Sequence, residues 1–263
     1  MSKSHSRTSG RHRAFSDPAF SNAQEIQARL RELSTPESAA LATRYFKTGP
    51  GQYGEGDRFL GIRAADLRRL ARAYHPCEWN DLATLIRSPV HEDRALALLL
   101  LVKHVETGSL DDHARAFELY LAHTAFVNNW DLVDISAKEL VGAYLARTTA
   151  PGERSLLDRL AQSDSLWERR IAIVATHFFI RQDQFDDTLR IAGLLLKDRH
   201  DLIHKAVGWM LREVGKRDQD VLEWFLRRHL DALPRTTLRY AIERFPKPLR
   251  RAYLTGDLED LPG

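Results

Sequence analysis

The sequence predicts an all-α protein in which helix pairs are stacked one on another. Apolar residues recur at three- and four-residue intervals through most of the chain, as they do on one face of an amphipathic helix. No segment shows the strict alternation of a convincing β-strand. An internal repeat of about 35 to 40 residues accompanies this pattern. Two helices per repeat of that length indicate a HEAT-like α-solenoid.

Nine segments carry the helical pattern. In chain order they are 23–33, 64–74, 94–106, 111–123, 130–147, 167–181, 186–197, 201–216 and 219–229. The breaks include SP at 88–89, TGS at 107–109, APG at 150–152 and SDS at 163–165. Serine and threonine favour helix starts, and glycine and proline favour helix ends. We therefore expect one helix per segment.

The repeat is visible when the segments are aligned on their charged positions. Arg94, Asp134, Arg170 and Lys205 then superimpose, at spacings of 40, 36 and 35 residues. The concave face of a solenoid lines up equivalent positions of successive repeats, so these side chains are expected to share one groove. Asp134 would be a single carboxylate among cations, which suits holding a polyanion while acting on one part of it.

Composition favours a soluble globular protein of a reducing compartment, the cytoplasm. The 263 residues are 43% hydrophobic and 29% charged, which allows a sizeable core. Cys77 is the single cysteine, which excludes a disulfide framework and a cysteine-based zinc cluster. The apolar run 96–102 is long enough for a buried helix and too short for a membrane span. A net charge of +3 permits nucleic-acid binding without requiring it.

Three regions are expected along the chain. Residues 1–20 are basic and serine-rich with no apolar segment after them, which predicts a disordered arm and not a secretory signal. Residues 21–254 are expected to form a single helical-repeat domain, and residues 255–263 a C-terminal tail. The glycine-rich segment 48–58 lacks the GK[ST] of a phosphate-binding loop, so we expect a flexible loop with Tyr53 near its tip.

One helix face carries the residues that stand out chemically. Trp130 and Asp134 are four residues apart, so a helix places them on one face, one turn from each other. Two other interpretations are open for Asp134. It could be a solvated charge, or it could form an ion pair with Arg169 or Arg170.

The other candidate positions have simpler explanations. Trp79 and Trp224 have no polar cluster around them, so we expect both in the core. His200 and His204 have the four-residue spacing of metal ligands, but no third ligand follows nearby, so we expect no metal site. Gly208, inside a helical segment, indicates that a neighbouring element approaches closely there. No Ser/His/Asp or Cys/His nucleophile set stands out.

Four stretches carry a resemblance to a known family. They are ATRYFK (42–47) with FLGIR (59–63) after it, NNWDLVD (128–134), LWERRIAIV (166–174) and LIHKAVGWMLRE (202–213). In that order they resemble the AlkD-type DNA alkylation-repair glycosylases, which are HEAT-like helical-repeat enzymes. The connector between Tyr45 and residues 59–63 is longer here than in the best-known members, which bears on groove contacts and adduct preference.

The resemblance implies a catalytic group of three residues. Asp134 matches the family's catalytic carboxylate, and Trp130 and Trp209 match the aromatic residues that flank the damaged nucleotide. Such enzymes hydrolyse the N-glycosidic bond of N3- or N7-alkylated purines in duplex DNA and leave an abasic site. An alkylated purine is cationic and leaves without protonation, so one carboxylate is enough to stabilise the sugar cation. No cofactor is expected.

The resemblance also implies a set of DNA contacts. Tyr45 matches a tyrosine at the cleft, and Arg170 matches the arginine that faces the DNA backbone. Lys205 and Arg212 are expected to hold phosphates together with Arg170. The expected partner is double-stranded DNA containing alkylated purines, bound by a monomer at the nucleoid, with the damaged base able to stay stacked.

Two alternatives remain open. One is a non-catalytic HEAT-repeat scaffold that binds a protein or peptide in its groove, in which Asp134 has no special role. The other is an inactive DNA-binding protein specific for branched or bent structures, which the basic arm and the glycine-rich loop would suit. Release of free alkylated base from methylated duplex DNA separates both from a glycosylase.

Overall fold

The computed structural model describes residues 22–258. This part of the chain is mostly helical and contains one isolated β-bridge, between Arg58 and Val90, and no strand. The all-α prediction is therefore confirmed. The arm predicted at residues 1–20 lies outside the described residues. The last helix ends at Thr255, where the predicted C-terminal tail begins, and residues 259–263 also lie outside the described part.

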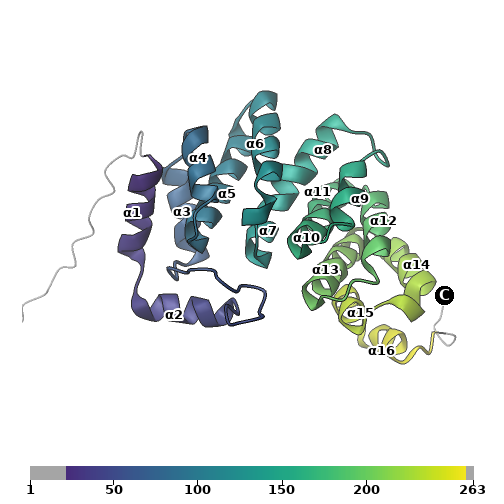
Figure 1. Cartoon of the computed structure of the whole chain (residues 1–263). Coiled ribbons are helices and arrows are strands. Elements are labelled where there is room, and N and C mark those ends of the chain that lie inside the picture. Colours follow the sequence, from purple (N-terminus) through teal and green to yellow (C-terminus); the bar gives the residue numbers. More distant parts are fainter. Residues whose placement is uncertain (1–21, 259–263) are drawn as a thin grey trace, which may run out of the picture.

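Sixteen α-helices follow one another in the described residues (Figure 1). In chain order they are α1 (Ala23–Leu33), α2 (Pro36–Tyr45), α3 (Ala64–Ala73), α4 (Trp79–Ile86), α5 (His91–Thr107), α6 (Leu110–Ala122), α7 (Trp130–Ala137), α8 (Ala143–Thr148), α9 (Ser155–Ala161), α10 (Leu166–Ala175), α11 (His177–Ile180), α12 (Asp186–Leu195), α13 (Asp201–Arg217), α14 (Gln219–His229), α15 (Arg235–Ala241) and α16 (Lys247–Thr255). A π-helix, Lys138–Gly142, joins α7 to α8, and short 3-10 turns lie at Thr124–Phe126 and Leu230–Ala232.

The helices form two layers. α3, α5, α7, α10, α13 and α15 pack side by side in this order and form a continuous row. α4, α6, α9, α12 and α14 form the second layer, and each packs against a helix of the row. Helix pairs stacked in sequence order form the α-solenoid that the repeat predicts (Figure 1).

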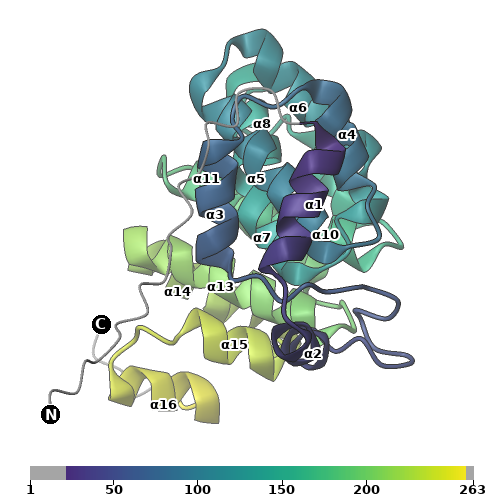
Figure 2. The same ribbon diagram turned by 90° about the vertical axis from the view of Figure 1, so that its left-hand side faces the viewer.

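α2 departs from this arrangement. It contains no buried residue and lies below the neighbouring N-terminal helices, with its axis along the stack (Figures 1 and 2). Pro36 at its first position and a capping box between Thr35 and Ser38 define its start. Because α2 ends at Tyr45, it delivers that side chain and the loop after it to the edge of the row.

Local sequence explains where the stacked helices begin and end. Ser109 and Asp112 form a capping box at the start of α6, and the Ser165 side chain accepts a hydrogen bond from the Glu168 N–H at the start of α10. Gly108 terminates α5. These residues fall in the predicted breaks at 107–109 and 163–165, so the helix ends there follow from cap chemistry.

α5 lies at the centre of the N-terminal half. It packs against α3, α4, α6 and α7. Between its charged first turn (91–94) and its polar last turn, α5 buries apolar residues on more than one side. Leu96, Leu98, Leu100 and Leu101 are all fully buried, so the apolar run 96–102 is a core helix. None of the helices in the described part of the chain is long and apolar enough to cross a membrane.

Some elements differ from the predicted segments. Segment 130–147 is divided by the π-helix, and segment 167–181 is divided at Thr176 into α10 and α11. Gly142 ends the π-helix where a Cβ would lie 2.2 Å from the Ala175 carbonyl oxygen, so the two divided segments approach closely. The structure also contains five short helices that the nine segments did not include, α2, α4, α9, α15 and α16.

Trp224 corrects one expectation about the core. Its side chain is 55% exposed, because Leu222, Phe225 and Leu226 form the buried face of α14 and Trp224 lies on the other face. Trp79 is half-buried and packs against the core, as expected.

Candidate active site

A cavity of about 440 Å³ lies where α7, α10, α13 and α15 meet the end of α2. This volume falls within the range of roughly 300–1,000 Å³ in which proteins bind small molecules. All the residues predicted from the sequence line it: Tyr45, Trp130, Asp134, Arg170, Lys205, Trp209 and Arg212. The structure adds four more: Lys47, Tyr53, Leu202 and Tyr240. The predicted residues, which are distributed between positions 45 and 212 of the chain, are therefore brought together in one place.

α7 presents Trp130 and Asp134 to this cavity. The Asn129 side chain accepts a hydrogen bond from the Trp130 N–H at 2.8 Å and so fixes the start of the helix. Leu132, on the opposite side of α7, and Val133, on its flank, are fully buried. The four-residue spacing then places the indole and the carboxylate on the side that lines the cavity.

Asp134 is held by a bidentate ion pair with Arg170. The Arg170 Nε and Nη2 groups donate to the two carboxylate oxygens, each at 2.9 Å, and Nη1 donates to the Leu202 carbonyl oxygen at 2.6 Å. The Asp134 side chain keeps 20% of its surface exposed, against 6% for Arg170. Burial raises the pKa of the Asp134 carboxyl above its ordinary value, and the attraction of Arg170 opposes this rise.

The buried guanidinium of Arg170 differs from the expectation that it faces the DNA backbone. It is one of the ion-pair partners considered for Asp134 from the sequence. Arg94, at the aligned position, is also buried and donates to Asp57 at 2.7 Å. Of the three aligned cations only Lys205 is well exposed, at 40% of its side chain. Repeat alignment identifies equivalent helix positions, but it does not reveal which carboxylate of a neighbouring helix lies within reach.

Trp130 stands among other aromatic rings. Phe46 stacks against it with ring centroids 5.6 Å apart, and Tyr45 meets it edge-on at 6.1 Å. The Tyr53 hydroxyl accepts a hydrogen bond from the Trp130 Nε1–H at 3.3 Å. Tyr45 is 65% exposed, so its ring is available at the mouth of the cavity.

Trp209 lies across the cavity on α13. Its Nε1–H donates to Glu213 at 3.1 Å. The preceding Gly208 touches α15 so closely that a Cβ would lie 2.5 Å from the Tyr240 Cβ and 2.6 Å from the Thr237 carbonyl oxygen. The close approach expected at Gly208 is therefore present, and it brings Tyr240 into the cavity. No sequence signal marks Tyr240, because its position depends on how α15 docks on α13.

The two remaining predicted cations already have carboxylate partners. Lys205 pairs with Asp201 at 2.7 Å. Arg212 pairs with Glu243 and lies 3.6 Å from Glu213. Exposed pairs of this kind contribute about 0–1 kcal/mol, so a phosphate could compete for Lys205 at low cost.

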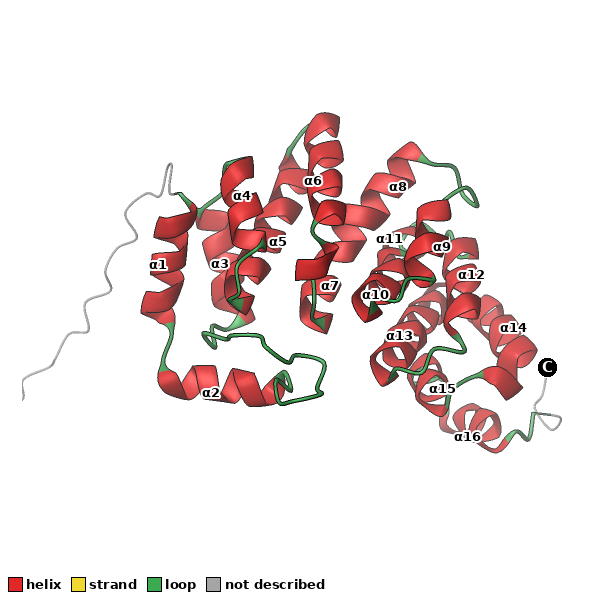
Figure 3. Ribbon diagram, viewed as in Figure 1, coloured by secondary structure: helices red, strands yellow, loops and turns green. Residues whose placement is uncertain are grey.

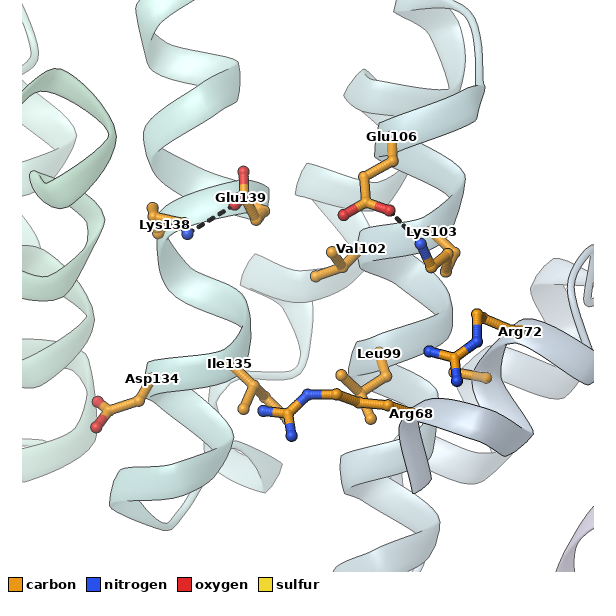
Figure 4. Close-up of a pocket in the computed structure, with 11 residues that line it drawn as sticks. Arg68, Arg72, Leu99, Val102, Lys103, Glu106, Asp134, Ile135, Lys138 and Glu139 are labelled. Carbon is orange, nitrogen blue, oxygen red and sulfur yellow. Dashed lines mark hydrogen bonds and ion pairs between the residues drawn. The ribbon is translucent and has the colours of Figure 1, made fainter. Parts of the chain in front are cut away.

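A second cavity, of about 340 Å³, lies on the other side of α7, between α3, α5 and the π-helix. Figure 4 shows Arg68 and Arg72 of α3 pointing into it. Asp134 also lines this second cavity, but in Figure 4 its carboxylate is directed away from the two arginines, toward the neighbouring helix. Two lysines of this cavity are paired with glutamates, Lys138 with Glu139 and Lys103 with Glu106. Within residues 22–258, neither Arg68 nor Arg72 has an ion-pair partner. Arg68 and Arg72 are four residues apart in segment 64–74, and this spacing was the sequence signal that could have placed two cations on one helix face.

The histidines with metal-ligand spacing have other partners. The His200 Nδ1 accepts a hydrogen bond from the Leu202 N–H and caps α13, and the His204 Nε2 lies 2.6 Å from the Asp198 carbonyl oxygen. Among the described residues, no group of three or more potential ligands is arranged to hold a metal ion.

The fold and the cavity together define an α-solenoid whose helix row has a cavity lined by a carboxylate and two tryptophans. Over residues 26–245 the chain matches the family described as DNA alkylation repair enzyme, and it belongs to that family. A comparison with curated proteins gave no match.

Solved structures share this helical arrangement. One is a predicted DNA alkylation repair enzyme from Enterococcus faecalis, with 21% identity, a TM-score of 0.61, and coverage of 81% of this chain and 97% of that one. Another is AlkD2 from Streptococcus mutans, with 16% identity, a TM-score of 0.50, and coverage of 86% of this chain and all of that one. At these identities the likeness supports the fold alone.

Proposed function

We propose that this member of the DNA alkylation repair family is a DNA glycosylase. It hydrolyses the N-glycosidic bond of N3- or N7-alkylated purines in duplex DNA and leaves an abasic site. The observation that carries the proposal is the Asp134 carboxylate, partly exposed in a cavity that Trp130 and Trp209 also line. We further propose that the protein acts as a monomer on nucleoid DNA in the cytoplasm.

The chemistry requires one fixed negative charge beside the sugar. An N7-alkylated purine is already cationic, so it departs without a general acid, and the transition state places positive charge on the deoxyribose. A carboxylate stabilises that charge and orients the attacking water. Arg170 donates to both Asp134 oxygens, which fixes the plane of the carboxylate. Each oxygen keeps a lone pair that Arg170 does not use and that is available to sugar or water.

The surrounding groups fit a nucleotide of a polyanion. The π-faces of Trp130 and Trp209 would stabilise a cationic base or sugar by about 0.5–2 kcal/mol each. Lys205 and Arg212 would exchange their carboxylate partners for phosphates, which makes binding depend on salt. Tyr45, at the mouth of the cavity, would contact the DNA strand. No step of this mechanism calls for a metal ion or a cofactor.

One observation favours a non-catalytic protein instead. Arg170 neutralises Asp134 through two hydrogen bonds, and a buried Arg–Asp pair is a common structural device. In that case the chain would bind DNA or a protein partner through its helix row without breaking a bond. The two functions differ in whether removing the Asp134 charge affects chemistry or only stability.

The deciding measurement is the release of free base from duplex DNA that contains N7-methylguanine, followed by chromatography under single-turnover conditions. The wild-type protein should release the base. Asp134→Asn should release it about 100-fold more slowly or worse, in line with losing one electrostatic stabiliser of roughly 2.7–4 kcal/mol. The variant should also lose about 1–3 kcal/mol of stability, because the asparagine amide replaces one of the two acceptor oxygens and leaves one N–H of Arg170 unpaired.

Asp187→Asn is the matched control. Asp187 pairs with Arg154 at 2.6 Å, with both side chains at most 2% exposed, and neither residue lines the cavity. Both variants should lose stability, but only Asp134→Asn should lose base release. Equal activity in the two variants would assign Asp134 to the structural ion pair and favour the non-catalytic alternative.

A further inference from the structure

A buried histidine joins the loop after α2 to the helix that carries Asp134. His91 is the first residue of α5, and its side chain is 3% exposed. Its Nε2–H donates to the Asp131 carboxylate at 2.8 Å, and its Nδ1 lies 3.5 Å from the Asp57 carboxylate. Asp131 is in the first turn of α7. Asp57 belongs to the loop, which Figure 3 shows in green between α2 and the lower end of α7.

Aromatic packing and a backbone hydrogen bond fix the orientation of the His91 ring. Phe59 stacks on it with ring centroids 4.4 Å apart, and Phe46 lies against it at 5.0 Å. The His91 N–H donates to the Arg58 carbonyl oxygen at 2.8 Å. Held in this way, the ring keeps both of its nitrogens beside carboxylates.

The charges around His91 balance only when its ring is protonated. Arg94 of α5 donates to Asp57 at 2.7 Å, which leaves the charge of Asp131 to His91. Among residues 22–258, no other cation forms an ion pair with Asp131. Burial opposes protonation, but the Asp131 and Asp57 carboxylates outweigh it and raise the pKa of the His91 imidazole above its ordinary value of 6.5. Below pH 6.5 the ring is therefore mainly an imidazolium.

The charge of Asp131 matters because Asp134 follows it by three residues on α7. Burial raises the pKa of the Asp134 carboxyl, Arg170 opposes this rise, and the negative charge of Asp131 adds to it. A protonated Asp134 would not stabilise a sugar cation. Any charge that favours its protonation would therefore reduce activity at the proposed site.

The other charged side chains near Asp134 do not add to this effect. Within residues 22–258, those that line a cavity with Asp134, besides Arg170, are two lysine–glutamate pairs of α5 and the π-helix and the cations Lys47, Arg68, Arg72, Lys205 and Arg212. Both glutamates are neutralised by their lysines. Asp131 is therefore the neighbouring carboxylate whose neutralisation depends on one buried histidine.

We infer that His91 is a positioning residue that holds Asp131 in place and cancels its charge, so that Asp134 remains an ionised carboxylate. The consequence for catalysis rests on the proposed glycosylase function. His91 is buried and does not line the cavity. It therefore acts through Asp131 and touches neither the sugar nor a phosphate.

Two single variants should shift the pH profile of base release in opposite directions. His91→Phe keeps a ring beside Phe59 and Phe46 but leaves Asp131 unpaired. The acidic limb of single-turnover N7-methylguanine release should then move up by about half a pH unit or more, as expected for a like charge one helical turn away. Asp131→Asn removes the negative charge, so the limb should move down.

The double variant His91→Phe, Asp131→Asn separates electrostatics from packing. It lacks both charges, so its acidic limb should return to the wild-type position. His113→Phe is the matched control, because His113 is also 3% exposed, lies 3.2 Å from Arg147 and lines neither cavity. This control removes a buried histidine without touching Asp131 and should leave the limb in place.

A measurement on the free protein does not depend on activity. The side-chain carboxyl carbon of Asp134, identified in an NMR spectrum by its absence from Asp134→Asn, reports the protonation of Asp134 directly. The midpoint of its titration should rise in His91→Phe, fall in Asp131→Asn and stay unchanged in His113→Phe.

The outcomes keep this inference apart from the proposed function. If His91→Phe slows release by the same factor at every pH and the Asp134 midpoint does not move, His91 has a purely structural role and the inference is wrong. Should His91→Phe fail to fold, an unmoved midpoint in Asp131→Asn would contradict the inference in the same way. If the wild-type protein releases no base, the proposed glycosylase function is wrong, and the NMR titration still decides whether His91 controls the ionisation of Asp134.

Discussion

At the scale of single residues, Arg170 has two opposing effects on the Asp134 carboxylate. Arg170 orients the carboxylate with two hydrogen bonds of 2.9 Å. In the proposed reaction, its positive charge would also weaken the negative potential that acts on the sugar cation. Without Arg170, burial would raise the pKa of Asp134 further. A protonated carboxyl would not stabilise a cation. We therefore propose that Arg170 keeps the carboxylate ionised and oriented, in place of contacting a phosphate.

The pH dependence of base release follows from this balance. The raised pKa of Asp134 places the loss of activity at a higher pH than the ordinary value of 3.8 for an aspartate. Activity should fall as pH decreases through that pKa, because only the ionised carboxylate acts. The effect on the free energy of unfolding has the opposite sign. Because the folded state binds the Asp134 proton more tightly than the unfolded chain does, the stabilisation from this proton is complete below pH 3.8 and is lost as pH rises through the folded-state pKa. Rates on N7-methylguanine, corrected for release without protein, measure the first effect.

Arg170→Lys provides the comparison for this pH profile. Lysine keeps the charge but loses the bidentate geometry and the bond to the Leu202 carbonyl oxygen. The acidic limb should move to higher pH and the rate at neutral pH should fall. The salt dependence of DNA binding should stay the same, because Arg170 is buried. A flatter salt dependence with an unchanged pH profile would make Arg170 a phosphate contact after all.

Residue spacing predicted much of this site, but not its ion pair. A separation of four on a helix was enough to place Trp130 and Asp134 on one face. The partner of Asp134 is 36 positions later in the chain. The packing of α7 against α10 decides whether the Arg170 guanidinium faces the groove or the carboxylate. Residue spacing does not predict that packing. Both geometries are compatible with the sequence, and the packing of the folded chain decides between them.

At the scale of helices, α3 offers free cations beside the site. Arg68 and Arg72 point into the second cavity and lack ion-pair partners within the described residues (Figure 4). The double variant Arg68→Ala, Arg72→Ala should reduce the slope of log affinity against log salt by about 1.8, or 0.9 for each lost phosphate contact. Binding to undamaged duplex DNA over a series of salt concentrations measures this slope.

Arg69→Ala serves as the control on the same helix. Arg69 pairs with Asp66 at 3.0 Å and does not line the second cavity. Its removal should change the slope by less than either cavity arginine. Equal slopes for the single variants at 68, 69 and 72 would mean that DNA does not follow this cavity.

The longest helices were predictable from sequence. Apolar residues recur at helical spacing along α13, whereas α4 and α15 are too short for such a pattern to emerge and depend on packing. The contacts of the 48–58 loop could not be predicted for a different reason. Its glycines suggest flexibility, but Asp57 within the same stretch holds it through a buried contact with Arg94, a partner 37 positions away.

At the scale of the whole molecule, the cavity depends on how the stack is assembled. Tyr45 at the end of α2 and Tyr240 in α15 are 195 positions apart, yet both line it. In a solenoid each helix pair contacts only its neighbours, so the position of Tyr240 is set by the docking of α15 on α13. A change far from Asp134 in the chain can therefore reshape the site.

Gly208 tests this dependence. Alanine there would place its Cβ 2.5–2.6 Å from Tyr240 and Thr237, so α15 must move away from α13. We expect Gly208→Ala to cost about 1–3 kcal/mol of stability, as overpacking does, and to slow base release by displacing Tyr240 and Trp209.

Gly193→Ala in α12 is the control, because its Cβ meets nothing within 4 Å. That variant should gain up to about 1 kcal/mol from helix propensity with unchanged release. Unfolding in urea measures the stability of both variants, and base release measures their activity. If the Gly208→Ala protein is destabilised but releases base at the wild-type rate, α15 has no part in the reaction.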